Sequence, residues 1–382
     1  MSDSSILPMN TRDDALELIG GKGRSLAKMS IAGFDVPTGF HLTADAYRAF
    51  VAENNLQTKI VELAKPTLDN DWVTFEPASA AIQKLITACE ISEAVTSQLR
   101  DTYAGLGSDP AVAVRSSANA EDLPGLSFAG QQDTYLNVKG EDALLEAVRN
   151  CWASLWTAQA ISYRFENEID QDSVAMAVVV QIMVPADVAG ILFTANPATG
   201  ERTEMIINAS FGLGEAVVGG QVTPDTYIID RESKQVKETM IGPKQQMIVA
   251  DGDQGTKLTD VEVADRDQSS LSDALINDLV ELALKIEKNY DGLPQDIEWA
   301  IVDGEIALLQ DTHRRAHVFA VTECRLMQLM KSDFHGLMET EPTLRREIAE
   351  VAAERLRQGD WATADVGDIP DEEIREQTRN EE

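Results

Sequence analysis

An arginine, two serines and several small residues, including glycine, occur together in the stretch Ala111–Thr134, AVAVRSSANAEDLPGLSFAGQQDT. A short apolar strand over residues 111–114 would deliver Arg115, Ser116 and Ser117 at its end. The loop that follows contains glycine, which lets backbone N–H groups turn towards a ligand, and the hydroxyls add donors. An arginine guanidinium can make two charge-assisted hydrogen bonds to one phosphate. The stretch is therefore suited to phosphate binding, although an ordinary surface loop explains its spacing equally well.

Three other polar side chains stand in patterns that favour ligand binding. Lys22 follows a glycine turn that opens a helix over residues 19–30, and helix starts attract anions. Gln181 interrupts an apolar strand pattern and needs a partner, which could be backbone or a ligand base. Glu215 lies in a glycine-rich loop and is a candidate for binding ribose hydroxyls. The alternatives are a solvated lysine and structural roles for the other two.

Residues 296–309, DIEWAIVDGEIALL, predict two strands joined by a turn at Asp303-Gly304. Glu298 and Gln310 would then lie near each other on adjacent strands. Paired oxygens of this kind suit a Mg²⁺ ion that carries nucleotide phosphates. A cross-strand polar pair with a purely structural role is the alternative.

Alternating helix and strand patterns must position these side chains. Helical periodicity predicts helices over residues 43–53, with Thr43 as N-cap, 54–106, 142–165 and 271–290. Strand patterns cover residues 134–138, 174–184, 190–194, 204–208, 227–230 and 237–249. Trp152 and Trp156 are expected in the core rather than against a ligand.

Composition narrows the class of protein. The chain has 382 residues, enough for two or three domains, and a net charge of −33, which argues against nucleic acid or an anionic membrane as partner. It shows no membrane-length apolar run and no signal peptide, and its separated cysteines, Cys89, Cys151 and Cys324, suit a reducing cytoplasm without a zinc site. The excess of acid also suggests adaptation to high salt.

Several blocks together resemble the N-terminal ATP-binding region shared by phosphoenolpyruvate synthase, pyruvate phosphate dikinase and rifampicin phosphotransferase. They are GGKGRSLAKM with a downstream VPTGF, AVRSSANAEDLPGLSFAGQQDT, GLGEAVVGGQVTPD and DIEWAI. The resemblance implies an α/β (α+β), ATP-grasp-like fold of two lobes over residues 1–310, with a break near 195–210. A short strand-plus-helix extension would follow.

The resemblance also implies which residues act. It assigns ATP binding to Lys22, Arg115, Gly130, Gln131, Gln132, Thr134, Gln181, Glu215, Glu298 and Gln310. Lys22 and Arg115 would hold the phosphates and be catalytic, with the 130–134 loop closing over them. Gln181 would lie near the adenine and Glu215 near the sugar, while Glu298 and Gln310 would hold Mg²⁺.

In this family the phosphoryl acceptor is a histidine on a separate domain, which passes the group on to pyruvate or another substrate. No histidine in this sequence lies in such a motif, so a histidine domain acting in trans is the expected partner. The family also carries an arginine where this sequence has Thr312, a change that implies a rate lower by about 100-fold or more. Arg314 or Arg315 could replace it.

Residues 304–358 resemble the second half of a cyclic-nucleotide-binding domain, with Glu305 at the ribose and Arg314 at the cyclic phosphate. Half a barrel leaves open edges, so a gene fusion is the simpler explanation. The acidic residues 359–382 predict a disordered tail. A non-enzymatic nucleotide sensor or fusion product, and a fragment of a rifampicin-type antibiotic kinase, are the alternatives to a phosphoenolpyruvate-synthase-type phosphotransferase module.

Overall fold

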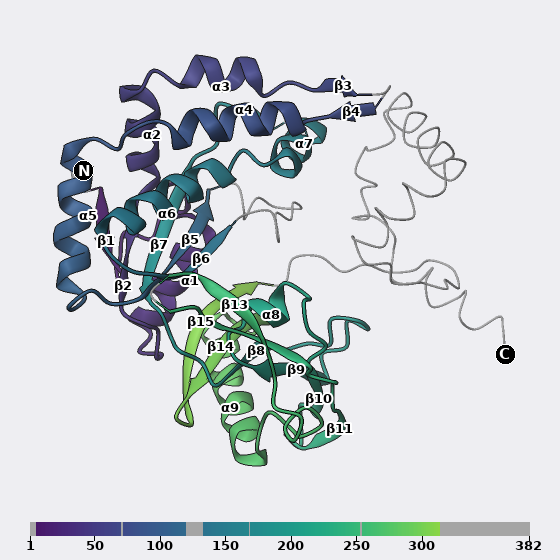
Figure 1. Ribbon diagram of the computed structural model, residues 1–382. Helices are drawn as coiled ribbons and strands as arrows, with labels where there is room; N and C mark the ends of the chain where they lie inside the picture. Colours follow the sequence, from purple (N-terminus) through teal and green to yellow (C-terminus); the bar gives the residue numbers. More distant parts are fainter. Residues whose placement is uncertain (1–4, 70–71, 120–132, 168, 253, 314–382) are drawn as a thin grey trace. The chain divides into compact units, whose positions relative to one another are not determined.

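The computed structural model describes residues 5–69, 72–119, 133–167, 169–252 and 254–313 (Figure 1). The chain divides into two units, and both large sheets belong to the first, which comprises Met1–Asp69 and Val73–Val318. The predicted C-terminal helix, the acidic tail and most of the extension lie outside the described residues. The predicted α/β class is confirmed.

A five-stranded sheet forms the first half of the fold, with strand order β1-β2-β7-β5-β6. Its strands are β1 (Ile6–Pro8), β2 (Gly39–Leu42), β7 (Met176–Ile182), β5 (Val112–Ala118) and β6 (Thr134–Val138). Neighbouring strands are antiparallel. β5 is longer than predicted, because every residue from Val112 to Ala118 pairs with β7 and is buried. Arg115 therefore lies within the strand rather than at its end.

A six-stranded antiparallel sheet forms the second half, in the order β11-β10-β9-β8-β14-β15. Its strands are β11 (Val236–Met240), β10 (Asp225–Asp230), β9 (Glu204–Phe211), β8 (Val188–Phe193), β14 (Gln295–Val302) and β15 (Glu305–His313). The chain changes sheets between Ile182 and Val188, where Pro185 cannot donate a backbone hydrogen bond to a sheet. The break between two lobes predicted near 195–210 stays a prediction.

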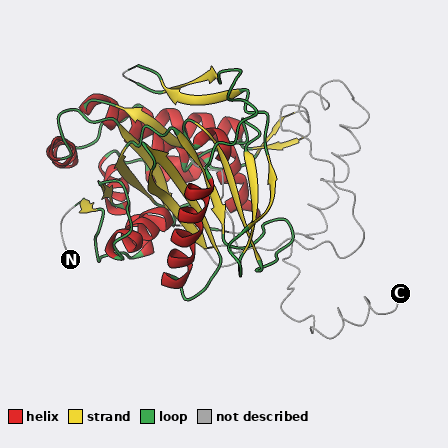
Figure 2. Cartoon of the chain, turned by 90° about the horizontal axis from the view of Figure 1, so that it is seen from below, coloured by secondary structure: helices red, strands yellow, loops and turns green. Residues whose placement is uncertain are grey.

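Helices accompany both sheets (Figure 2). They are α1 (Leu16–Ile31), α2 (Ala44–Glu53), α3 (Gln57–Leu63), α4 (Glu76–Thr87), α5 (Glu93–Gly105), α6 (Glu141–Ser154), α7 (Ala158–Glu166), α8 (Glu215–Val218) and α9 (Asp273–Asn289). The single helix predicted over residues 142–165 is two helices, because Thr157 caps α7 by accepting a hydrogen bond from the Ala160 N–H. Thr43 precedes α2 as predicted, but its side chain makes no capping hydrogen bond.

Two small hairpins complete the described part of the chain. They pair β3 (Thr67–Asp69) with β4 (Trp72–Thr74), and β12 (Gln246–Ala250) with β13 (Thr256–Asp260). The first lies in the stretch predicted as helical scaffold. The second begins within residues 237–249, which were predicted as sheet and in which Pro243 separates β11 from β12.

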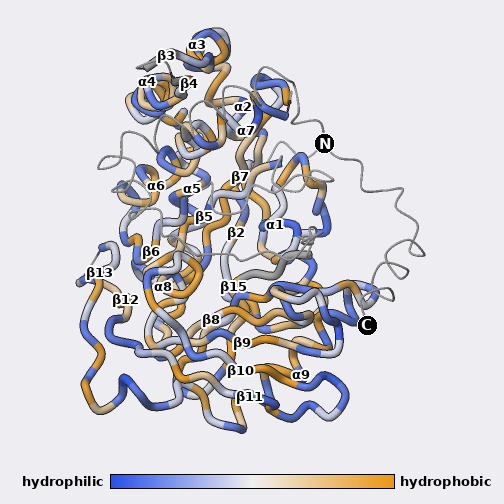
Figure 3. The backbone as a smooth tube through the Cα atoms, turned by 90° about the vertical axis from the view of Figure 1, so that its right-hand side faces the viewer, coloured by the Kyte–Doolittle hydropathy of each residue, from blue (hydrophilic) through white to orange (hydrophobic). Residues whose placement is uncertain are grey.

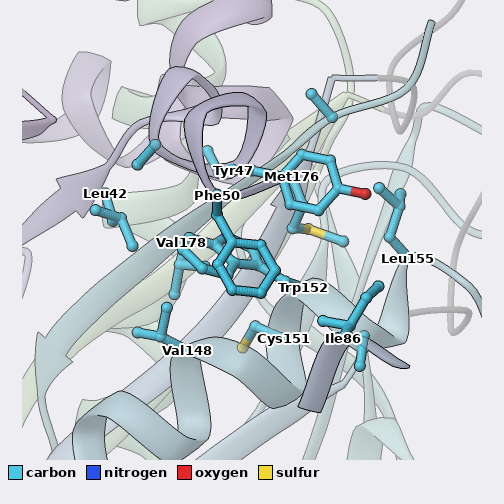
Figure 4. Packing of buried hydrophobic residues seen from close by; sticks show 14 of the residues in the cluster. Leu42, Tyr47, Phe50, Ile86, Val148, Cys151, Trp152, Leu155, Met176 and Val178 are labelled. Atoms are coloured by element: carbon cyan, nitrogen blue, oxygen red, sulfur yellow. The ribbon is translucent and has the colours of Figure 1, made fainter. Parts of the chain in front are cut away.

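Hydrophobic side chains from helices and strands pack together in a core beside the five-stranded sheet. Figure 3 shows hydrophobic segments, in orange, alternating with hydrophilic ones along the backbone. Trp152 of α6 is fully buried, with its ring centroid 4.8 Å from that of Phe50 and 6.0 Å from that of Tyr47 (Figure 4). Trp156 donates a hydrogen bond to the Tyr47 hydroxyl. The prediction that both tryptophans belong to the core is confirmed. Among the described residues, no helix is long and apolar enough to span a membrane.

Candidate nucleotide-binding site

Three of the predicted ligand-binding residues share one face of the five-stranded sheet. Arg115 lies directly opposite Thr134 of β6 and opposite Val179 of β7. Gln181 lies opposite Ala113, two residues before Arg115. Paired residues, and residues two apart on a strand, point to the same face of a sheet. Arg115, Thr134 and Gln181 are therefore brought together although they come from three different strands.

Helix α1 brings Lys22 next to β5 through a kink. Gly20 has φ 69° and ψ −179°, which interrupts the helix, and Lys22 follows two residues later. The Ser117 hydroxyl accepts a hydrogen bond from the Gly23 N–H (3.0 Å) and donates one to the Ile19 carbonyl (2.8 Å). The helix starts three residues before its predicted start, at Leu16, and Lys22 belongs to the part that resumes after the kink.

An ionic contact joins the two sheets at Arg115. Its Nη1 lies 3.4 Å from Oε2 of Glu298 on β14, and the two side chains are 9% and 22% exposed. The Nε of Arg115 is buried and has no hydrogen-bond partner among the described residues. A buried guanidinium with one long contact retains the capacity to bind an anion.

The β14–β15 hairpin has the predicted register. Glu298 lies directly opposite Gln310 in the backbone pairing. The turn is formed by Asp303 (φ 51°) and Gly304 (φ 83°), the left-handed pair typical of a two-residue hairpin loop. In the described part of the chain, no cluster of three or more histidine, cysteine, aspartate or glutamate side chains could hold a metal ion by itself.

Gln181 is 2% exposed, and its Nε2 has no hydrogen-bond partner within the described ranges. Leaving such a donor unpaired costs about 1–3 kcal/mol. The sequence predicted that this side chain would find either a backbone partner or a ligand base. Among the described residues Nε2 makes no backbone hydrogen bond, so it is available to a ligand.

The two serines after Arg115 differ from their predicted use. Ser117 bridges the kink of α1, and Ser116 donates a hydrogen bond to the Asp133 carbonyl (2.9 Å). Both hydroxyl hydrogens are thus used within the protein and are not free for a phosphate. Sequence reasoning missed the bridge by Ser117; its only local signal was the Gly20-Gly21 pair, which indicates a break in the helix.

Of the remaining candidate residues, only some lie in the described part of the chain. Glu215 is the first residue of α8, and its Oε2 accepts a hydrogen bond from the Thr256 hydroxyl (3.4 Å). Glu305 is exposed at the turn of the hairpin, opposite Val302 and away from the Glu298–Gln310 end. Residues 130–132 and Arg314 lie outside the described residues.

Sequence comparison identifies the family. Residues 16–319 match the family "Pyruvate phosphate dikinase, AMP/ATP-binding domain", and the chain belongs to this family. The match includes the predicted ligand residues and every strand of the two large sheets except β1. The resemblance of residues 304–358 to a cyclic-nucleotide-binding domain is not supported: residues 305–313 form β15 of the six-stranded sheet, and the family match runs to residue 319.

Curated relatives resemble the chain over most of its length. It is 44% identical over 302 residues to a probable phosphoenolpyruvate synthase of Methanothermobacter thermautotrophicus, covering 78% of this chain and 44% of that protein. The phosphoenolpyruvate synthase of Pyrococcus furiosus is 38% identical over 338 residues (77% and 41%). The rifampicin phosphotransferase of Streptomyces sviceus is 42% identical over 313 residues (81% and 36%). The chain thus spans less than half the length of these relatives.

Among solved structures, a D-alanine-D-alanine ligase from Helicobacter pylori is 13% identical, with a TM-score of 0.27. It covers 62% of this chain and 53% of the ligase. A likeness of this size does not bear on the function of the chain.

Proposed function

We propose that this protein binds ATP together with Mg²⁺ and acts as the phosphoryl-donating module of a phosphotransferase of the phosphoenolpyruvate synthase type. The observation that carries the proposal is the convergence of Arg115, Thr134 and Gln181 on one sheet face, with Glu298 of the other sheet in contact with Arg115. Membership of an AMP/ATP-binding family supports it.

Each residue has a role that its surroundings allow. Arg115 and Lys22 bind the phosphates. The Nε of Arg115 has no hydrogen-bond partner among the described residues, and Gly23, next to Lys22, donates its N–H to Ser117 on the same face of β5. Gln181 binds the adenine through Nε2, which has no hydrogen-bond partner within the described part of the chain. Glu215 binds the sugar, and Thr134 and residues 130–132 bind the phosphates.

Glu298 and Gln310 would hold the magnesium ion, which neutralises phosphate charge when bound. Magnesium usually takes one or two carboxylates from the protein and completes its shell with water and substrate phosphates. One partly exposed carboxylate beside a phosphate-binding arginine fits that donor set.

Catalysis at such a site consists of positioning and charge neutralisation of the transferred group. Two cations from the protein hold the phosphates, and the site transfers the phosphoryl group to a histidine of a separate domain. That domain then hands it to pyruvate. The similarity to a rifampicin phosphotransferase makes an antibiotic the alternative final acceptor.

A non-enzymatic nucleotide sensor is a second candidate function. It is favoured by Thr312, which replaces the arginine expected from the family and lies opposite Asp296 in the backbone pairing. Without that cation the transferred group is less stabilised, whereas ground-state binding of ATP persists. Transfer of labelled phosphate to a histidine domain supplied in trans separates the two functions.

Calorimetric titration with ATP and Mg²⁺ tests the proposal. We expect Arg115→Ala to weaken binding by about 10- to 100-fold, because it removes charge-assisted hydrogen bonds to phosphate. Glu298→Ala should reduce the effect of Mg²⁺ on affinity. Arg100→Ala is the matched control, since Arg100 forms an exposed ion pair with Glu141. A wild-type protein that binds no ATP contradicts the proposal.

A further inference from the structure

The kink in α1 creates a second helix start inside the helix. Gly20 has a non-helical backbone, and the helix resumes with Gly21, Lys22 and Gly23. The first N–H groups of any helix lack partners within the helix. Normally a side chain at the N-cap position accepts a hydrogen bond from the second or third residue of the helix. Gly20 occupies that position and has no side chain to do so.

Ser117 takes over this capping role from a different element. Its hydroxyl accepts the hydrogen bond of the Gly23 N–H, the third residue after the kink, from a strand 94 residues further along the chain. A side chain on Gly20 is excluded, because an added Cβ would lie 2.2 Å from the Ser117 carbonyl oxygen and 2.4 Å from its hydroxyl oxygen. Gly20 and Ser117 therefore depend on each other, because the missing side chain of Gly20 leaves the space that Ser117 fills.

The same hydroxyl also fixes the backbone before the kink. It donates a hydrogen bond to the Ile19 carbonyl, so that Lys22 lies between two backbone groups that Ser117 holds. Ser117 is completely buried, two residues after Arg115 on the same face of β5. Strand β5 thus contains Arg115 and, through Ser117, also fixes the backbone on either side of Lys22.

We propose that Ser117, which supplies the capping hydrogen bond to the second half of α1, is a positioning residue for Lys22 and sets the distance between the two phosphate-binding cations. This inference rests on the proposed function, because it gives Lys22 and Arg115 a common ligand. Its consequence is that loss of the Ser117 hydroxyl weakens ATP binding through Lys22 and not through a contact of its own.

A double-mutant cycle on ATP affinity tests the inference in the full chain with Mg²⁺. We expect Ser117→Ala to raise the dissociation constant about tenfold, because a displaced Lys22 makes a weaker charge-assisted contact with the phosphates. In a Lys22→Met background the same change should have little further effect, because residues that act through one another are not additive. Ser154→Ala is the control: it removes a buried hydroxyl that donates to the Cys151 carbonyl and should lower stability only.

Wild-type affinity in Ser117→Ala, or full additivity with Lys22→Met, overturns the inference. Ser117→Cys, with a thiol that bonds more weakly than a hydroxyl, takes its place if the alanine variant does not fold, and should also bind ATP more weakly. A wild-type protein that fails to bind ATP refutes the proposed function itself. If the wild type binds ATP and Lys22→Met weakens binding, but Ser117→Ala does not, the inference about Ser117 is wrong and the proposed function stands.

Discussion

His41 is a buried base that packs beneath the kink of α1. It is fully buried on β2, its Nε2 lies 3.2 Å from the Met9 carbonyl oxygen, and a Cβ added to Gly23 would lie 3.2 Å from its Nδ1. Burial lowers the pKa of His41 from 6.5 to about 4, against a smaller opposite effect of the hydrogen bond to Met9. The ring is therefore neutral in the folded protein at neutral pH.

This lowered pKa predicts a loss of stability in mild acid. The unfolded chain takes up the proton near pH 6.5, whereas the folded chain does so only near pH 4. The contribution of His41 is thus complete above pH 6.5 and is lost as the pH falls to 4, by about 3 kcal/mol. Urea unfolding across this range should show a steeper decline for the wild type than for His41→Gln. Equal pH dependence of the two proteins would contradict the prediction.

At the scale of elements, the β12–β13 hairpin is attached to β6 by Asn137. This residue is 2% exposed, has φ 54°, and directs its amide group to the carbonyl oxygens of Gly255 (3.0 Å) and Gly252 (3.4 Å). The Gly255 N–H returns a hydrogen bond to the Asn137 carbonyl. Because β13 starts with Thr256, which contacts Glu215, this attachment also supports the expected sugar-binding residue.

Substitutions at Asn137 should separate backbone from side-chain effects. Asn137→Gly keeps the positive φ but removes the amide, so we expect a loss of about 1–2 kcal/mol. Asn137→Asp keeps the shape but turns a buried carboxylate towards two carbonyl oxygens, so its loss should be larger. Denaturant unfolding and hydrogen exchange in the hairpin measure both effects.

Asn55 provides the matched control for Asn137. It also has a positive φ, of 53°, but it is exposed. Glycine and aspartate at position 55 should therefore behave alike. An aspartate at position 137 that is tolerated as well as glycine would contradict the proposed attachment.

Elements with local signals could be predicted, and those that depend on distant partners could not. The Asp303-Gly304 turn and the alternation around it specify the hairpin that pairs Glu298 with Gln310. In contrast, residues 115–117 of β5 are polar, and they are strand because β7 buries them. The cap supplied by Ser117 comes from 94 residues away, so the local Gly20-Gly21 pair indicates a break in the helix but not the residue that caps it. Likewise, Arg115 and Gln181 lie on one face of the sheet only because of the register between β5 and β7.

At the scale of the whole molecule, the sequence contains 65 acidic residues and only 32 basic ones. Repulsion among so many like charges opposes the compact state. Salt weakens this repulsion, because the screening length falls from about 10 Å at 0.1 M to about 3 Å at 1 M. The few cations near the site, above all Arg115, are therefore surrounded by a chain of opposite net charge.

We expect the thermal unfolding midpoint to rise as potassium chloride is increased from 0.1 to 1 M, because screening reduces this repulsion. Sucrose at equal osmolality is the control for effects that do not depend on charge. A midpoint that does not respond to the salt would show that the acidic residues are spaced too widely to matter. It would also count against adaptation to high salt.

The end of β15 has a consequence for linked domains. The strand runs to His313, so the backbone passes Gln310, opposite Glu298, just before the strand ends. In an engineered fusion, a domain joined after residue 313 by a short flexible linker would begin beside the proposed phosphate-binding residues. Tethers of this kind give effective concentrations in the millimolar range. An acceptor linked there could thus have a weak intrinsic affinity for this site and still meet it often.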